Sequence, residues 1–162
     1  MMDLQQRFSH YLQQLRAMLL KVPEPLFDSS LAPDMFPLAT HAKIAANFSL
    51  RGYCPLIGCE PVSFIRPEQT RAAVLQQIDD SLQYLAKAKP VTQFDDSVML
   101  SDKAGFNQLE LCQSDFINVY IFPNFLFHIS MVYAIARANG VALSKGDFDG
   151  LHSYPEGFSF IE

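Results

Sequence analysis

Residues 124–140 read NFLFHISMVYAIARANG. This stretch decides the fold class because apolar residues recur at helical spacing along it and a glycine follows the last of them. Apolar side chains recur every three or four residues, the spacing that buries one face of an α-helix. Gly140 stands where glycine commonly ends a helix. The period predicts a helix over residues 114–139, with these apolar positions: Ile117, Tyr120, Ile121, Phe125, Phe127, Met131, Val132, Ile135 and Ala138. Pro123 is expected either to kink it or to mark where a preceding turn gives way to the helix proper.

Three earlier segments show the same three-and-four spacing of apolar residues, and we expect helices over residues 3–21, 33–52 and 67–89. Pro33 and Pro67 each precede an acidic residue. Proline suits the first turn of a helix, and a carboxylate there is stabilised by the helix dipole, so both prolines are predicted helix starts.

The remaining segments lack a helical period. Residues 52–66 are expected to be a loop, and residues 97–112 alternate apolar and polar side chains around a turn, which predicts a β-hairpin. The glycine- and proline-containing tail, residues 141–162, is expected to be a loop or a short strand. The sequence therefore predicts a mainly α protein, a four-helix bundle in one domain (residues 1–162), with a short β-hairpin between helices three and four.

Composition narrows the classes of partner. Hydrophobic residues make up 49% of the 162 residues and charged residues 18%, so some apolar surface is expected to be covered by a second copy of the chain. The net charge is −5 with no run of Lys or Arg, which argues against nucleic-acid binding. No signal peptide is evident, and no segment approaches the roughly 18 uninterrupted apolar residues that a membrane span needs.

The cysteines Cys54, Cys59 and Cys112 are an odd number, which argues against a disulfide framework. The C-x4-C spacing of the first two is not that of a zinc ribbon or a thioredoxin motif. Buried or incidental reduced thiols in a cytoplasmic protein are the expectation.

Three polar residues fall in register with apolar helix faces: His41, Asn124 and His128. In one interpretation the two histidines face each other across the bundle and bind a divalent ion, with Asn124 or water completing the shell. In the other, Asn124 and His128 form a hydrogen-bonded pair that fixes helix packing. Two histidines are a small ligand set, because catalytic zinc usually takes three protein ligands.

Other polar residues give weaker signals. His152 in the tail is a candidate third ligand, although a lone tail histidine is usually exposed, and His10 is expected on the surface. Two pairs of acidic residues lie in loop-like stretches, and without the ligand run of an EF-hand they are expected to be solvated turn residues: Asp95 with Asp96, and Asp147 with Asp149.

Four stretches resemble the bacterial family known as domain of unknown function 1993. They are LAPDMFPL at residues 31–38, PNFLFH at 123–128, YAIARANGV at 133–141 and LSKGDF at 143–148, where Ser144 replaces a usual glycine. That family is placed in the DinB/YfiT-like superfamily of proposed metalloenzymes, so the resemblance implies an up-down-down-up four-helix bundle that often forms homodimers.

The resemblance also implies a site. Relatives include metal-dependent thiol transferases and hydrolases, and the usual superfamily site has one histidine on helix two and a His-x-x-x-His pair on helix four. Here His41 stands for the first and His128 for one member of the pair, whereas Asn124 and Val132 occupy the positions four before and four after it. The second histidine of the pair is missing.

Three hypotheses follow. The first is a cytoplasmic homodimer whose metal site is reduced or lost, with a small polar pocket formed by His41, Asn124, His128 and Tyr120. The second is a metal-dependent hydrolase or thiol transferase holding zinc or nickel, which requires the two histidines within about 4 Å of each other. The third is a non-catalytic module that binds a partner protein through apolar surface.

Overall fold

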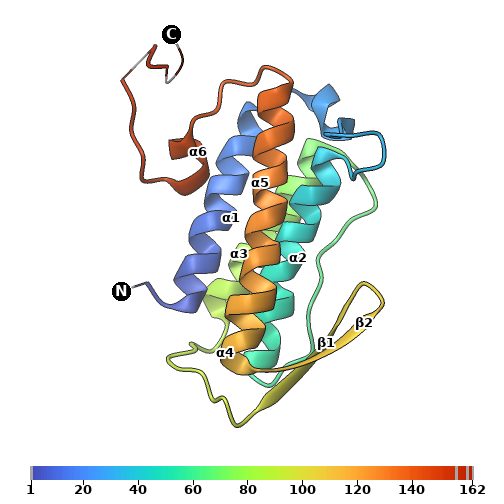
Figure 1. Ribbon diagram of the computed structural model, residues 1–162, viewed down its shortest axis with the longest axis vertical. Coiled ribbons are helices and arrows are strands. Elements are labelled where there is room, and N and C mark those ends of the chain that lie inside the picture. Colours follow the sequence, from blue (N-terminus) through green and yellow to red (C-terminus); the bar gives the residue numbers. More distant parts are fainter. Residues whose placement is uncertain (1, 156, 160, 162) are drawn as a thin grey trace.

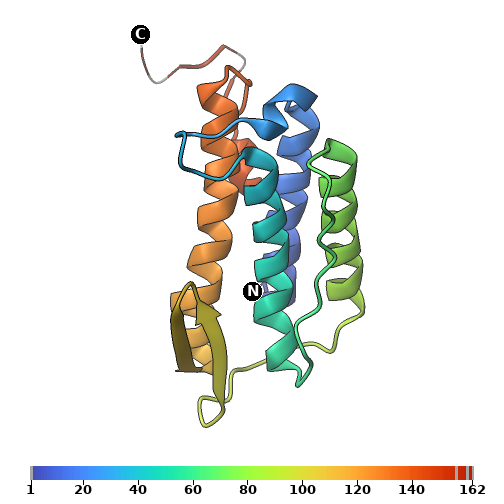
Figure 2. The same ribbon diagram turned by 90° about the vertical axis from the view of Figure 1, so that its right-hand side faces the viewer.

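The computed structural model describes residues 2–155, 157–159 and 161. Four long helices lie side by side in a bundle (Figure 1), namely α1 (Leu4–Lys21), α2 (Leu38–Leu56), α3 (Arg71–Lys87) and α5 (Phe122–Ala138). The chain runs up α1 and down α2, returns along the length of the bundle, then runs down α3 and up α5 (Figure 2). The predicted bundle and its up-down-down-up order are confirmed.

The shorter elements lie at the ends and edges of the bundle. They are η1 (Glu24–Asp28), β1 (Met99–Ala104), β2 (Asn107–Cys112), α4 (Gln113–Asp115), the π-helical η2 (Phe116–Ile121) and α6 (Lys145–Asp149). The strands β1 and β2 pair antiparallel from Met99 opposite Cys112 to Ala104 opposite Asn107. The predicted hairpin between the third and fourth long helices is therefore confirmed, and it lies at the lower end of the bundle (Figure 1).

The predicted start of the second helix at Pro33 is wrong. Residues 30 and 37 form an isolated β-bridge, and the Leu38 amide donates to the Ser29 carbonyl at 2.8 Å, so residues 31–37 are a closed loop. Helix α2 also continues past Gly52 to Leu56. Gly52 permits a close helix contact, because an added Cβ would lie 2.4 Å from the Ile121 side chain.

The third helix begins four residues later than predicted. Thr70 is its N-cap, and the Thr70 hydroxyl accepts a hydrogen bond from the Ala73 amide at 3.3 Å. A threonine cap satisfies one of the free amides of the first turn, which a proline at position 67 does not do. The cap therefore overrides the proline as the start signal.

Pro123 does not interrupt the last long helix. It lies in the first turn of α5, directly after the π-helical segment η2, so Pro123 marks a change of helix type and not the end of a preceding turn. Gly140 ends the helix with a φ of 80°, as predicted.

The tail contains a helix where a loop or short strand was expected. Ser144 and Asp147 form a capping box at the start of α6. Lys21 of α1 donates to the Asp147 carboxylate at 2.6 Å, and α6 packs against α1. Residues 156, 160 and 162 of the predicted tail lie outside the described residues.

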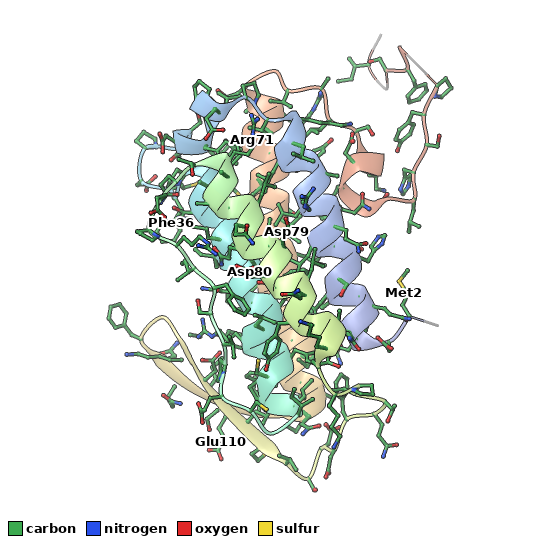
Figure 3. The ribbon with its side chains drawn as sticks, turned by 180° about the vertical axis from the view of Figure 1, so that it is seen from behind. Met2, Phe36, Arg71, Asp79, Asp80 and Glu110 are labelled. Atoms are coloured by element: carbon green, nitrogen blue, oxygen red, sulfur yellow. The ribbon has the colours of Figure 1, made fainter. Side chains whose placement is uncertain are left out.

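The buried face of each long helix contributes to the core. The largest fully buried side chains include Phe8, Phe27, Tyr53, Phe116 and Phe125. Asp79 and Asp80 both lie on α3 (Figure 3). Asp79 forms an ion pair with Arg16 of α1 at 2.7 Å, and Asp80 forms one with Arg66 of the connection before α3 at 3.0 Å.

The continuous helical stretch Gln113–Ala138 is 26 residues long and has a mean hydropathy of 1.5 over its most apolar window. By length and composition alone it is able to cross a membrane. Half of that window (50%) is buried inside the bundle, and core helices of soluble proteins commonly meet the same two criteria.

Candidate functional site

The structure brings His41 and His128 together in the interior of the bundle. His41 lies in the first turns of α2 and His128 in the second turn of α5, and these two helices pack against each other. Their Nδ1 atoms are 2.9 Å apart, a hydrogen-bonding distance. Only 2% of His41 and 9% of His128 is exposed. The two histidines that the periodicity placed on core faces therefore form a direct pair.

Aromatic rings surround this pair. Phe48 of α2 stacks on His128 with ring centroids 5.8 Å apart, and Phe127 of α5 lies 5.1 Å from His128 and 6.2 Å from His41. Phe36, in the loop before α2, lies 6.0 Å from His41. Phe36 and Phe127 are both about half exposed, so they form the outer cover of the histidine pair.

Burial makes both imidazoles weaker bases than usual. It lowers the pKa of His41, and burial together with the charge of His41 lowers the pKa of His128 to about 4. Removing a charged imidazolium from water is unfavourable, and two imidazolium groups in contact repel each other. Both side chains are therefore neutral at neutral pH.

A neutral imidazole has one N–H donor and one acceptor nitrogen, so one histidine donates to the other. The Nε2 atom of His41 is buried without a hydrogen-bond partner among the described residues. If His41 Nδ1 is the donor, this Nε2 is an unused acceptor. In the opposite tautomer it is an unused donor, which proteins tolerate less well. The geometry therefore favours donation from His41 to His128.

Asn124 and Tyr120 lie close to the pair but face other partners. The Asn124 amide donates to the Tyr120 backbone carbonyl at 2.7 Å, in place of the Asn124–His128 hydrogen bond that one interpretation of the sequence required. That interpretation therefore named the wrong hydrogen-bond partner for the Asn124 amide. The Tyr120 ring packs against Phe48, with centroids 6.0 Å apart, and burial raises the pKa of its hydroxyl.

The donor set for a metal is small. Within the described ranges 2–155, 157–159 and 161, no group of three or more His, Cys, Asp and Glu side chains is placed to hold an ion. The candidate third ligand, His152, pairs instead with the Asp149 carboxylate in the tail. His41 and His128 are thus the two candidate ligands that the described residues bring together, whereas catalytic zinc usually takes three protein ligands.

The structure corrects the expectations for two further polar residues, His10 of α1 and Asp149 of α6. His10 is partly buried, with its Nε2 2.7 Å from the Asp149 carbonyl oxygen. Asp149 is 8% exposed, and hydrogen bonds from the amides of His152 and Leu151 are the main causes of its low pKa, about 2. Asp149 is therefore a structural residue at the contact between α6 and α1, and not a solvated turn residue.

The acidic residues before the last helix have a capping role. Asp96 accepts hydrogen bonds at 2.8 Å from both the amide and the hydroxyl of Ser114, which lowers the pKa of its carboxyl. Asp95 accepts from the Ser97 amide and hydroxyl. Both residues are therefore anchored locally around the hairpin.

Sequence reasoning missed the role of Arg51. Its guanidinium donates to both carboxylate oxygens of Asp102 in β1 at 2.5 and 2.8 Å, and it lies 5.2 Å from the Phe48 ring centre. This contact fixes the hairpin to α2. A hollow of about 320 Å³ lies beside it, lined by Ile44, Asn47, Phe48, Arg51, Pro61, Val62 and Ser63. Phe48 thus separates the hollow from His128.

Comparison with known proteins agrees with this architecture. The chain is similar to the crystal structure of a DinB family member protein from Shewanella denitrificans, with 27% sequence identity and a TM-score of 0.76. The similarity covers 92% of this chain and 90% of that one. No curated protein matches the sequence. The family model described as "Domain of unknown function (DUF1993)" matches residues 1–149, so the chain belongs to that family and has a DinB-like fold.

Proposed function

We propose that this protein is a DinB-like bundle whose metal centre is reduced to a neutral histidine pair, and that the pair forms the end of a small polar pocket. The observation that carries the proposal is the 2.9 Å contact between the Nδ1 atoms of His41 and His128, in a site that gathers no third ligand among the described residues. The Nδ1 atom that each imidazole would offer to a shared metal ion is instead in contact with the Nδ1 atom of the other imidazole.

The nearby hollow supports a role in binding a small molecule. Phe48 lines the hollow on one side and stacks on His128 on the other. A small molecule bound in the hollow would therefore lie against the ring that packs on His128. The unused acceptor nitrogen of His41 is the group of the pair that a hydrogen-bond donor would satisfy.

The alternative is a metal-dependent hydrolase or thiol transferase, and one observation favours it. The two Nδ1 atoms meet the requirement that both ligands lie within about 4 Å. Two nitrogens on a tetrahedral zinc, each about 2.1 Å from it, would be about 3.4 Å apart, so the imidazoles would have to separate slightly. A zinc or nickel ion there would act as a Lewis acid, and among the described residues His41 and His128 would hold it.

Metal analysis of the purified full-length protein distinguishes the two. We expect plasma mass spectrometry to find zinc, nickel and iron well below one atom per chain, while circular dichroism shows a folded helical protein. The variants His41→Ala and His128→Ala should not change that content. Near-stoichiometric metal that both variants lose, and that the control variant His152→Ala retains, would overturn the proposal in favour of the enzyme.

We further propose that the protein acts as a homodimer in the cytoplasm. Phe36 and Phe127 leave apolar surface over the histidine pair, in a chain in which only 18% of residues are charged. Apolar surface of this kind is commonly covered by a partner. The free thiols of Cys54, Cys59 and Cys112 suit a reducing compartment.

Light scattering tests the dimer directly. We expect a mass of twice the 18.3 kDa of one chain, and a shift to monomer for Phe36→Glu, because a carboxylate in an apolar interface loses its hydration. Phe106 is fully exposed at the tip of the hairpin, so Phe106→Glu is the matched control and should remain dimeric. A monomeric parent protein would contradict the proposal.

A further inference from the structure

Helix α2 ends in a complete Schellman motif. The Gly58 amide donates to the Pro55 carbonyl at 3.1 Å and the Cys59 amide donates to the Cys54 carbonyl at 3.0 Å. Gly58 has a φ of 74°, the left-handed conformation that this motif requires and that glycine adopts without strain. These two hydrogen bonds and the left-handed Gly58 fix the backbone positions of the residues before and after the glycine.

This motif places the two cysteines next to each other. The residues joined by its longer hydrogen bond, here Cys54 and Cys59, are the ones whose side chains usually touch. With 3.0 Å between the Cys59 nitrogen and the Cys54 oxygen, ordinary bond lengths hold the two Cα atoms within about 7 Å. Disulfides usually join Cα atoms about 4.4–6.8 Å apart, so the motif holds the two residues within or close to that range.

The two thiols have complementary surroundings. Cys54 is buried, and its thiol donates to the Tyr84 hydroxyl of α3 at 3.5 Å. Cys59 is exposed. The hydrogen bond with Cys54 is the main cause that raises the pKa of Tyr84 to about 12, and the charges of both cysteines add to it. The Cys54 sulfur therefore lies beside the Tyr84 hydroxyl and is protected from solvent, whereas the Cys59 sulfur, 3.9 Å from the Ile57 carbonyl oxygen, belongs to an exposed residue.

We propose that Cys54 and Cys59 form a reversible intramolecular disulfide when the protein meets a peroxide. The exposed Cys59 thiolate attacks one peroxide oxygen, the O–O bond breaks, and hydroxide leaves, which gives a sulfenic acid on Cys59. The Cys54 sulfur then attacks the Cys59 sulfur, and the sulfenic oxygen leaves as water once protonated. Two thiols and one hydrogen peroxide thus give one disulfide and two waters.

The bond would change the end of α2. It would tie the last turn of the helix to the connection that follows, and it would remove the thiol that donates to Tyr84. A small-molecule or protein dithiol would reverse the step by exchange. Disulfides of this kind in reducing compartments are typically transient and redox-sensing.

Peptide mapping of the full-length wild-type protein tests the inference without relying on a variant that has to fold. Trypsin cleaves after Arg51 and Arg71 but not at the Arg66–Pro67 bond, so both cysteines fall in one peptide, residues 52–71. After brief treatment with hydrogen peroxide, quenching, denaturation and alkylation, we expect this peptide to have lost two hydrogen atoms and to carry no alkyl group. Dithiothreitol should restore two alkylation sites.

The control variant Cys112→Ser should behave like the wild type, because Cys112 lies on β2, away from the motif. In Cys59→Ser, Cys54 should remain a free thiol that alkylates once the protein is denatured. Oxidation of Cys59 to sulfinic acid with Cys54 left as a thiol would overturn the proposal. A disulfide that joins either residue to Cys112 or to a second chain would overturn it as well.

Discussion

The free energy of unfolding is expected to fall by about 3 kcal/mol as the pH is lowered from 6.5 to 4, because the buried His128 must be protonated. Its pKa is about 4 in the folded protein and 6.5 in the unfolded chain. Each unit between the folded and unfolded pKa values is worth about 1.36 kcal/mol. In this window the unfolded state binds more protons than the folded state. The contribution of His128 to stability is therefore present above pH 6.5 and is lost as the pH falls. Burial lowers the pKa of His41 as well, so it acts in the same direction.

Urea denaturation at a series of pH values measures this effect. The variant His128→Leu should give a shallower profile between pH 6.5 and pH 4, because only the buried His41 of the pair remains to be protonated. The variant His152→Ala should keep the slope of the wild type. Asp149, with a pKa of about 2, loses its contribution only at lower pH and does not interfere. A wild-type stability that is constant across the window would show that the histidine pair is solvated, and would contradict the buried site.

The bundle is predictable from the sequence because each long helix shows its buried face as a period of apolar residues. Helix boundaries are less predictable, because they depend on single hydrogen bonds. The predicted starts at Pro33 and Pro67 are wrong for this reason: the chain begins α2 where Leu38 bonds to Ser29, and α3 where Thr70 caps Ala73. Proline is tolerated in the first turn of a helix, but its side chain cannot accept a hydrogen bond from the free amides there.

The candidate site is predictable only in part. His41 and His128 lie in regular helix, so counting residues placed both on core faces. Asn124 lies in the same regular helix as His128, but its amide donates to the Tyr120 carbonyl four residues back. Residue counting places a side chain on a helix face and does not say which hydrogen-bond partner it takes.

The pairing of Cys54 with Cys59 had a signal in the sequence. A cysteine, then a glycine four residues later, then a second cysteine is the spacing of a Schellman motif whose touching positions are both cysteine. The expectation that the helix ended near Gly52 hid this spacing. A boundary error of four residues was enough to separate Gly58 from the end of the helix.

Two phenylalanines on the same turn of α5 are expected to differ strongly in their effect on stability. Phe125 is fully buried, and its ring meets the Phe8 ring of α1 edge to face with centroids 5.2 Å apart. We expect Phe125→Ala to lower the free energy of unfolding by about 3–5 kcal/mol, because it leaves a large cavity between α1 and α5. Urea denaturation at pH 7 and 25 °C, with circular dichroism as the probe, measures the loss.

Phe127→Ala is the matched control, because it removes the same number of atoms from a ring that is 50% exposed. Its effect at neutral pH should be about 1 kcal/mol or less. The same variant opens the cover of His41 and His128, so their pKa values should rise toward 6.5 and the pH dependence of stability should shrink. Equal losses for the two variants at neutral pH would mean that Phe127 is buried in solution, as it would be in a homodimer that uses this face. The dimer would then have to be dissociated, through Phe36→Glu, before the two effects are compared.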